Sequence, residues 1–235
     1  MIEVRNLAFS YPRKKILRDV SFVVSPGEIV SVVGANGVGK TTLLKILATL
    51  AVPDSGTVMM DGSDALSRPL RYRRQIGYLP ERVSLYDDMT VKSYLHYRAK
   101  LKGEPAKRVR RRVSEAVELC QIAHCLAEPI RTLSAGLCKR VALADALLLR
   151  PRVLLLDDFL SGLDRGMREA AGTVLSNAAA FSSVVVTGHE IEDFSRWTTR
   201  FVVLRDGIVS SSIDATGLEP EALRERLRAA MKGDD

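Results

Sequence analysis

The glycine-rich stretch GANGVGKT, residues 34–41, constrains this 235-residue chain more than any other feature. It fits the pattern G-x-x-x-x-G-K-[ST] and lies between the apolar run IVSVV, residues 29–33, and the helix-forming stretch KTTLLKILATL, residues 40–50. Glycines let successive backbone N–H groups curl around an anion, and the start of the helix adds its positive end. The stretch therefore predicts a strand, a phosphate-binding loop and a helix.

The side chains of this loop predict what it binds. Lys40 offers a positive charge to the β- and γ-phosphates of a nucleotide, and Thr41 offers a hydroxyl to Mg²⁺. We therefore expect ATP and Mg²⁺ as cofactors. The expected contacts from the loop are Asn36, Gly37, Gly39, Lys40, Thr41 and Thr42.

A second acidic element follows the apolar run VLLL, residues 153–156. Asp157 comes directly after this expected strand, where a phosphate-loop protein orders Mg²⁺ through water. Asp158 is then free to hold the water that attacks the γ-phosphate, or to take up its proton. The alternative is that the paired aspartates only cap a turn.

Short β-branched runs alternate with helical stretches, which predicts an α/β fold with a mixed sheet, antiparallel early and parallel later. The Asp206-Gly207 pair between two such runs predicts a hairpin. The expected strands cover residues 2–9, 20–24, 29–33, 57–60, 76–79, 153–156, 184–187, 201–205 and 208–213.

Helical patterns interrupt and follow the sheet. Residues 87–127 read as helices broken at Gly103 and Pro105, and residues 219–232 read as a surface helix with a proline in its first turn. We expect one nucleotide-binding domain with an inserted helical subdomain. Its parts are a core with an antiparallel portion (1–85 and 151–217), the helical subdomain (86–150), and a C-terminal helix and tail (218–235).

Composition narrows the class of protein. No apolar run reaches the roughly 18 residues of a membrane-spanning helix, and no signal peptide is visible. Three sparse cysteines favour a reducing cytosol. Cys120, His124 and Cys125 lie close together, so a zinc site is an alternative to simple packing, although a closed site needs four ligands.

The net charge of +7 owes much to the basic stretch from Arg98 to Arg112. This stretch predicts a solvated helical face; the alternatives are contact with an anionic membrane surface or an acidic partner. We expect no nucleic acid as partner, because no reader motif accompanies the charge.

With these motifs in place, the chain resembles the ATP-binding cassette (ABC) family, the ATPase subunits of ABC transporters, from Ile2 to about Ile213. The motifs follow the family's order. They are Tyr11 in FSYPRKKIL, the loop GANGVGKTT, Glu81 in IGYLPE, Ser134 and Gly136 in LSAGLCKR, the strand VLLLDD, Asp164 in SGLD, and His189 in VVVTGHE.

The resemblance implies a role for each of these residues. Tyr11 would stack on adenine, and Glu81 would be a Mg²⁺ ligand within the catalytic site together with Asp157 and Thr41. His189 would contact the γ-phosphate, with Asp164 across a dimer interface. Alternatives exist for two of them: Tyr11 as an aromatic at a strand edge, and His189 as a core histidine.

The resemblance also implies partners. In the family, two nucleotide domains meet head to tail, so that Ser134 and Gly136 of one subunit would face the ATP on the phosphate loop of the other. We expect a homodimer, or a pseudo-dimer with a homologous ATPase subunit, attached to a membrane permease on the cytoplasmic face. The segments IGYLPE and SLYDDMTVKSYL most resemble cassettes of ABC-2 type exporters, including the gliding-motility subgroup. Residues 81–89 are the candidate contact with the permease.

Departures from the family pattern leave two functional hypotheses. Glu81 replaces the usual Gln. LSAGLCKR, residues 133–140, matches the family's signature motif, from which Ala135 and Leu137 depart. Asp158 replaces the usual catalytic Glu, which sets the carboxylate back by about 1.5 Å, and Phe159 replaces the usual Pro. The chain is therefore expected to be either a transport ATPase, slow unless the backbone compensates for the shorter side chain, or an ATP-gated clamp with an assembly or regulatory role.

Overall fold

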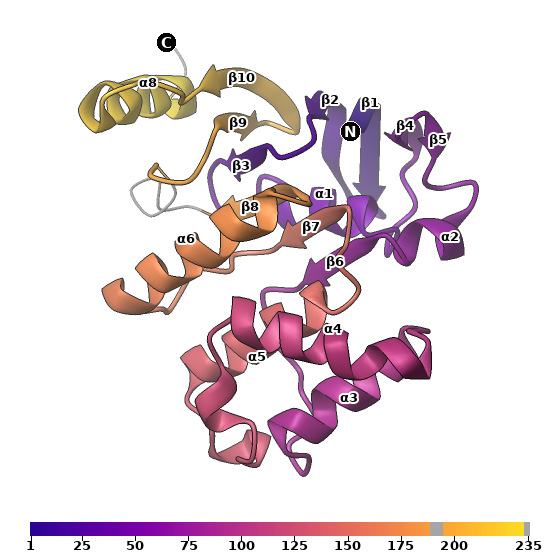
Figure 1. Ribbon diagram of the computed structural model, residues 1–235. Coiled ribbons are helices and arrows are strands. Elements are labelled where there is room, and N and C mark those ends of the chain that lie inside the picture. The colour runs from indigo at the N-terminus through magenta and orange to yellow at the C-terminus, as the bar shows by residue number, and fades with distance from the viewer. Residues whose placement is uncertain (189–194, 233–235) are drawn as a thin grey trace.

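The computed structural model describes residues 1–188 and 195–232. Within these residues, ten strands form one sheet in the order β5-β4-β1-β2-β10-β9-β3-β8-β7-β6 (Figure 1). The strands are β1 (Ile2–Tyr11), β2 (Lys14–Val24), β3 (Ile29–Val33), β4 (Ser55–Met60), β5 (Ser63–Asp64), β6 (Ile76–Leu79), β7 (Val153–Leu156), β8 (Ser183–Gly188), β9 (Arg200–Arg205) and β10 (Ile208–Asp214). The helices are α1 (Lys40–Leu47), α2 (Pro69–Arg73), α3 (Val91–Leu101), α4 (Ala106–Leu119), α5 (Ala135–Leu147), α6 (Arg165–Ala179) and α8 (Pro220–Lys232), with short 3₁₀ turns η1 (Ala123–Cys125) and η2 (Ile130–Thr132).

The sheet is mixed, as the sequence predicts. Strands β9, β3, β8, β7 and β6 run parallel, whereas β1, β2, β4 and β5 form an antiparallel part. The predicted Asp206-Gly207 hairpin joins β9 to β10. Because the carboxyl ends of parallel strands meet at one edge, the last residues of β3, β6, β7 and β8 lie along the same edge of the sheet.

Two apolar layers bury the central strands on both faces. Along β3, Ile29 and Val33 pack into the layer beneath α3 to α6 and α8, while Val30 and Val32 pack into the layer around α1. Every residue of β3 and β7 is buried. This double covering explains why the two strands read as continuous apolar runs rather than alternating ones.

The chain between β6 and β7 forms the helical part seen below the sheet in Figure 1. Residues 80–152 are all described and contain no sheet strand, as predicted. The helix predicted to continue to residue 127 is too long, however. Helix α4 ends at Leu119 because Gln121 adopts φ 55°, a left-handed conformation that a helix cannot continue through.

The solvated face predicted for the whole basic stretch from Arg98 to Arg112 is wrong for part of it. Arg98 donates two hydrogen bonds to Asp145 of α5, at 3.1 and 3.0 Å, and Lys102 Nζ lies 3.0 Å from Asp145 Oδ1. These contacts tie α3 to α5. Arg108 and Arg110 remain exposed on α4.

The cysteine-rich segment packs rather than presenting metal ligands. Cys120 and Cys125 are buried, and burial raises the pKa of the Cys120 thiol to about 12, which keeps it neutral. Among the described residues, no group of three His, Cys, Asp or Glu side chains is placed to hold a metal. The burial of both thiols is what the packing alternative expects.

At the other end of the chain, α8 begins at Pro220 as predicted and buries Leu223 and Leu227. Across residues 1–188 and 195–232, no helix has the length and apolarity needed to cross a membrane.

Candidate nucleotide site

The phosphate loop between β3 and α1 depends on two glycines for steric reasons. Gly34 has φ 154°, and a Cβ there would lie 2.3 Å from the Leu204 carbonyl oxygen. Gly39 has φ 116°, and a Cβ there would lie 2.8 Å from Leu17 Cδ2. Any larger residue would push the loop away from the sheet, so the motif's glycines serve packing as well as phosphate approach.

Lys40, the first residue of α1, folds back over this loop. Its Nζ donates to the carbonyl oxygens of Gly34 at 2.6 Å and Ala35 at 3.0 Å. Burial lowers the pKa of Lys40, while the nearby carboxylates of Asp158 and Asp157 act against that shift. The ammonium group is thus held over the loop, in a position where phosphate oxygens can replace the carbonyls as its partners.

The loop forms one wall of a pocket of about 500 Å³, a volume within the range typical of small-molecule sites. The pocket collects residues from β1, the phosphate loop, α1, and the carboxyl ends of β6, β7 and β8. Ten of the predicted site residues line this pocket, together with Ile16 and Thr187. The ten are Tyr11, Asn36, Gly37, Gly39, Lys40, Thr41, Thr42, Glu81, Asp157 and Asp158.

Asp157 lies at the floor of this pocket. Its Oδ1 accepts hydrogen bonds from Thr41 Oγ1 at 3.1 Å and from Thr187 Oγ1 at 2.7 Å. Burial raises the pKa of Asp157; the two hydroxyl donors lower it, and the charges of Glu81 and Asp158 raise it further. A cation would relieve this crowding of carboxylates.

The donor set fits Mg²⁺. The Thr41 hydroxyl and the carboxylates of Asp157 and Glu81 are hard oxygen ligands, which Mg²⁺ prefers. Mg²⁺ prefers octahedral coordination and usually keeps several waters, so phosphate oxygens and water would complete the shell around these three side chains. That arrangement is typical of phosphoryl-transfer sites.

Asp158 has an unusual backbone. Its φ is 45°, in the left-handed region, and its N–H donates to Thr187 Oγ1 at 3.0 Å. The Thr187 hydroxyl therefore binds both neighbours, donating to the Asp157 carboxylate and accepting from the Asp158 amide. Sequence reasoning missed Thr187; the available signal was a polar residue at the end of the buried run VVVT.

Lys139 of α5 is a second residue that sequence reasoning missed. Its Nζ donates to the carbonyl oxygens of Phe159, at 3.2 Å, and of Ser161. Burial lowers the pKa of Lys139, and the charges of Asp158 and Glu81 raise it. Lys139 thus joins the helix that carries the signature to the turn that carries Asp158. Phe159, at the position where Pro was expected, is buried in the core.

The signature residues lie away from the pocket. Ser134 caps α5, accepting from the Leu137 N–H at 3.3 Å, and Asp164 caps α6, accepting from the Met167 N–H at 2.8 Å. Gly136 packs against α6, where an added Cβ would lie 2.2 Å from Met167 Sδ. None of Ser134, Gly136 and Asp164 lines the pocket. His189 lies outside the described residues.

Comparison with known proteins agrees with this geometry. The family model described as "ABC transporter" matches residues 17–161. The chain therefore belongs to the ABC transporter family, and it is an ATPase subunit of that family.

Relatives and solved structures extend the likeness to most of the chain. The Nod factor export ATP-binding protein I of Burkholderia orbicola is 32% identical over 98% of this chain and 81% of its own length. The spermidine/putrescine import ATP-binding protein PotA of Aggregatibacter actinomycetemcomitans is 30% identical over 89% of this chain, which spans 57% of that protein. The dimeric structure of MJ0796, a bacterial ABC transporter cassette, superimposes with a TM-score of 0.83 and 26% identity, covering 93% of this chain and 100% of that one.

Proposed function

We propose that this chain is the ATP-hydrolysing subunit of an ABC-2 type exporter, and that two nucleotide-binding subunits close on ATP and reopen after hydrolysis. One observation carries the proposal: the ATP-facing residues share one pocket, whereas Ser134, Gly136 and Asp164 stand outside it. A site whose parts lie on two faces of one chain can be completed by a second subunit. The dimer structure of the cassette MJ0796 supports this arrangement.

In the proposed reaction, the phosphate loop and Lys40 hold the β- and γ-phosphates, and Tyr11 stacks on adenine. Thr41, Asp157 and Glu81 would hold Mg²⁺, which would neutralise charge on the phosphates. Asp158 orients the attacking water and accepts its proton. Ser134 of the second subunit donates to the γ-phosphate, and Gly136 lies beside it at the interface. The role proposed for His189 is contact with the γ-phosphate, with Asp164 across the interface.

The proposed partner is a separate membrane permease, which would keep the chain on the cytoplasmic face of the membrane. The export role rests on the resemblance to ABC-2 cassettes and on the likeness to the Nod factor export subunit. A spermidine/putrescine import subunit is 30% identical, nearly as similar as the export subunit. The choice of export over import therefore depends on the resemblance to ABC-2 cassettes rather than on overall sequence identity. The division into a core, a helical subdomain (86–150) and a C-terminal helix is part of the same proposal.

Residues 81–89 are the proposed contact with the permease. Asp87 is exposed there, and Tyr86 is 46% exposed while its ring packs edge-on against Tyr94 and Tyr97 of α3. The segment thus joins Glu81, in the ATP pocket, to the helical part of the chain, so a partner that moves it would affect both.

The proposal is tested by measuring ATP turnover and dimerisation together. Purified chain should hydrolyse ATP with Mg²⁺, and Lys40→Ala should abolish both turnover and the ATP-dependent dimer because the phosphates lose their charge partner. A control variant of an exposed cation, Arg110→Ala on α4, should keep both. Turnover that survives Lys40→Ala would contradict the proposal.

A second candidate function is an ATP-gated clamp that hydrolyses very slowly. Its support is Asp158, whose side chain is one methylene shorter than Glu and whose backbone sits at φ 45°. A displacement of about 1 Å at a catalytic group can cost on the order of 100-fold in rate. Single-turnover measurement separates the two: a clamp would stay closed on ATP far longer than any transport cycle requires.

A further inference from the structure

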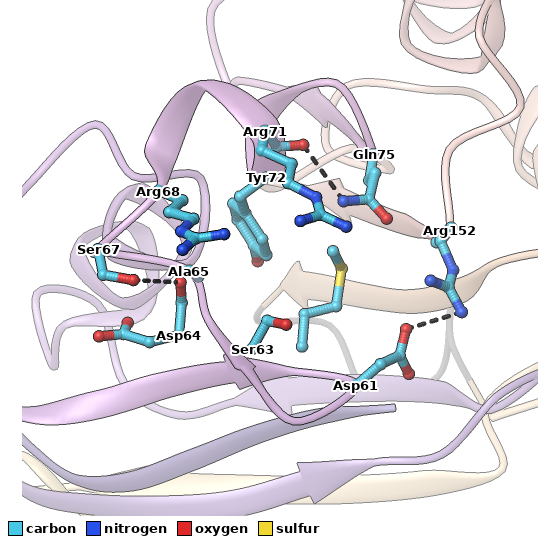
Figure 2. A pocket seen from close by; sticks show the side chains of 11 residues that line it. Asp61, Ser63, Asp64, Ala65, Ser67, Arg68, Arg71, Tyr72, Gln75 and Arg152 are labelled. Atoms are coloured by element: carbon cyan, nitrogen blue, oxygen red, sulfur yellow. Dashed lines mark hydrogen bonds and ion pairs between the residues drawn. The ribbon is translucent and has the colours of Figure 1, made fainter.

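A second pocket lies apart from the nucleotide site. It has a volume of about 480 Å³ and shares no lining residue with the nucleotide pocket. Its walls come from the β4–β5 hairpin, from α2 with Gln75 beyond it, and from Arg152 just before β7 (Figure 2). Nothing in the proposed ATPase cycle uses these residues.

Arginines dominate the lining of this pocket. Arg68, Arg71 and Arg152 all face it, and in Figure 2 the ring of Tyr72 lies between the side chains of Arg68 and Arg71. Only Arg152 has a counter-charge, since its Nη2 lies 2.7 Å from Asp61 Oδ2. The side chains of Arg68 and Arg71 form no hydrogen bond or ion pair with any residue that the structure describes.

The acidic residues of the lining do not balance these charges. Asp61 is already shared between Arg152 and the N-terminal ammonium group, which lies 2.8 Å from its Oδ1, and these cations hold the pKa of Asp61 below its usual value. Asp64 Oδ1 accepts the Leu66 N–H at 2.8 Å. Two unpaired guanidinium groups therefore open onto one pocket, an arrangement that an anion would stabilise.

Tyr72 gives an independent indication of a ligand. Tyr72 lies on α2, lines the pocket and is only 3% exposed. Its hydroxyl is buried and has no hydrogen-bond partner among the described residues. Burial raises the pKa of Tyr72 well above its usual range, so the group stays a neutral donor. A buried hydroxyl without a partner is destabilising, and a ligand oxygen that accepts from it would relieve this.

We propose that this pocket binds a small molecule through an oxyanion, either a phosphate or a carboxylate group. Arg68 and Arg71 pair with the oxyanion, because guanidinium groups match its oxygens in forked geometry. The Tyr72 hydroxyl donates to the same ligand. Asp64 stands at the edge of the pocket as an acceptor, which favours a ligand that also carries hydroxyl or amino groups.

The test uses the whole chain with ¹³C-labelled tyrosine, of which it has six. A non-hydrolysable ATP analogue with Mg²⁺ occupies the phosphate loop, so that added anions cannot bind there. Inorganic phosphate and, separately, citrate are titrated at constant ionic strength while the tyrosine ring signals are followed. Saturable shifts confined to Tyr72 are expected, and the anion that produces them identifies the group as phosphate, carboxylate or either.

Variants tie the shifts to the two arginines. Arg68→Ala and Arg71→Ala should each weaken the response about tenfold, since each removes a charge-assisted pair. The matched control is the double variant Arg108→Ala/Arg110→Ala, which removes exposed charge from α4 and should leave the titration unchanged. Shifts that never saturate with either anion, or that weaken equally in the control, would overturn the proposal.

Tyr72→Phe gives a second readout that does not depend on the arginines. It keeps the buried ring and removes only the hydroxyl, so the free protein should melt at the same or a higher temperature, because an unpaired buried donor is lost. The anion response should weaken about tenfold. A lower melting temperature without added anion would mean that the hydroxyl has a partner within the chain, and the proposed ligand contact would be wrong.

Discussion

Two regions of this chain, the phosphate loop with its pocket and the signature segment, differ in how completely the fold assembles them. The phosphate loop, Asp157 and Thr187 are bound to one another within the chain, and their residues line a single pocket. Ser134 and Asp164 instead cap their own helices and do not line that pocket. In the proposed dimer, the half-site on the phosphate loop is therefore formed by folding alone, whereas the half-site on the signature would acquire its ligand from a second subunit.

The largest expected effect is on the formed half-site. Asp158→Asn removes the carboxylate that accepts a proton, so turnover should fall by about 100- to 10,000-fold while ATP still binds. Asp158→Glu should raise turnover above wild type if the short side chain limits the rate. Steady-state phosphate release from the three proteins checks both. If the Asn variant hydrolyses ATP as fast as wild type, residue 158 is not the catalytic base.

The signature half should respond differently. Ser134→Ala should reduce turnover by about 100-fold but leave ATP affinity of the isolated chain unchanged, because the hydroxyl meets ATP only across the interface. The lost helix cap should also cost about 0.5–2 kcal/mol of folding free energy. Ser134→Thr, which keeps the hydroxyl and the cap, is the control. If Ser134→Ala weakened ATP binding by the monomer, Ser134 would contact ATP within its own chain, and the proposed difference between the two half-sites would be wrong.

Thr187 tests how the formed half-site holds its shape. Thr187→Val removes one hydroxyl that serves two neighbours, leaving the Asp158 amide and the Asp157 carboxylate each short of a partner. We expect about 1–3 kcal/mol of lost stability and about tenfold slower turnover, measured by denaturant unfolding and phosphate release. Thr187→Ser should restore both. Val and Ser behaving alike would show that the hydroxyl has no such role.

Lys139 connects the two regions within one chain. Lys139→Met should lower kcat by about tenfold with KM for ATP nearly unchanged, because the turn after Asp158 loses two hydrogen bonds while the phosphate loop is untouched. Lys139→Arg should rescue much of the loss. A change in KM alone would instead place Lys139 in nucleotide binding.

The smallest expected effect on isolated activity is at the proposed permease contact. Asp87→Lys reverses a charge on an exposed residue and should leave basal turnover within about twofold of wild type, as surface substitutions usually leave stability unchanged. Stimulation by the permease in reconstituted vesicles should be lost. Loss of basal and stimulated turnover together would indicate misfolding rather than uncoupling.

The sequence predicted the buried parts of this molecule best. The runs 29–33 and 153–156 coincide with β3 and β7, because strands covered on both faces read as unbroken apolar stretches. The run 76–79 coincides with β6, which lies at the end of the sheet and is only partly buried. The strand expected from Val20 begins earlier, at Lys14, because its exposed face carries charged residues. Helices α2 and α6 were not predicted, the first because it is a single short turn rich in arginine.

Motifs with fixed spacing predicted most of the residues that line the nucleotide pocket. Residue type alone did not predict the contributions of Thr187 and Lys139. Thr187 and Lys139 act through hydrogen bonds to backbone atoms of another segment, which leave no spacing pattern in the sequence. Gly136 was expected to face phosphate; the structure adds close packing against Met167, which a motif cannot reveal.

The shared site is tested most directly by mixing two inactive variants. Lys40→Ala disables the phosphate loop, and Ser134→Arg disables the signature, so neither protein should hydrolyse ATP alone. In an equal mixture, mixed dimers would bring the intact Lys40 of one copy to the intact Ser134 of the other, and turnover should reappear. A mixture no more active than its separate components would contradict the claim that two copies of this chain complete one another's ATP sites.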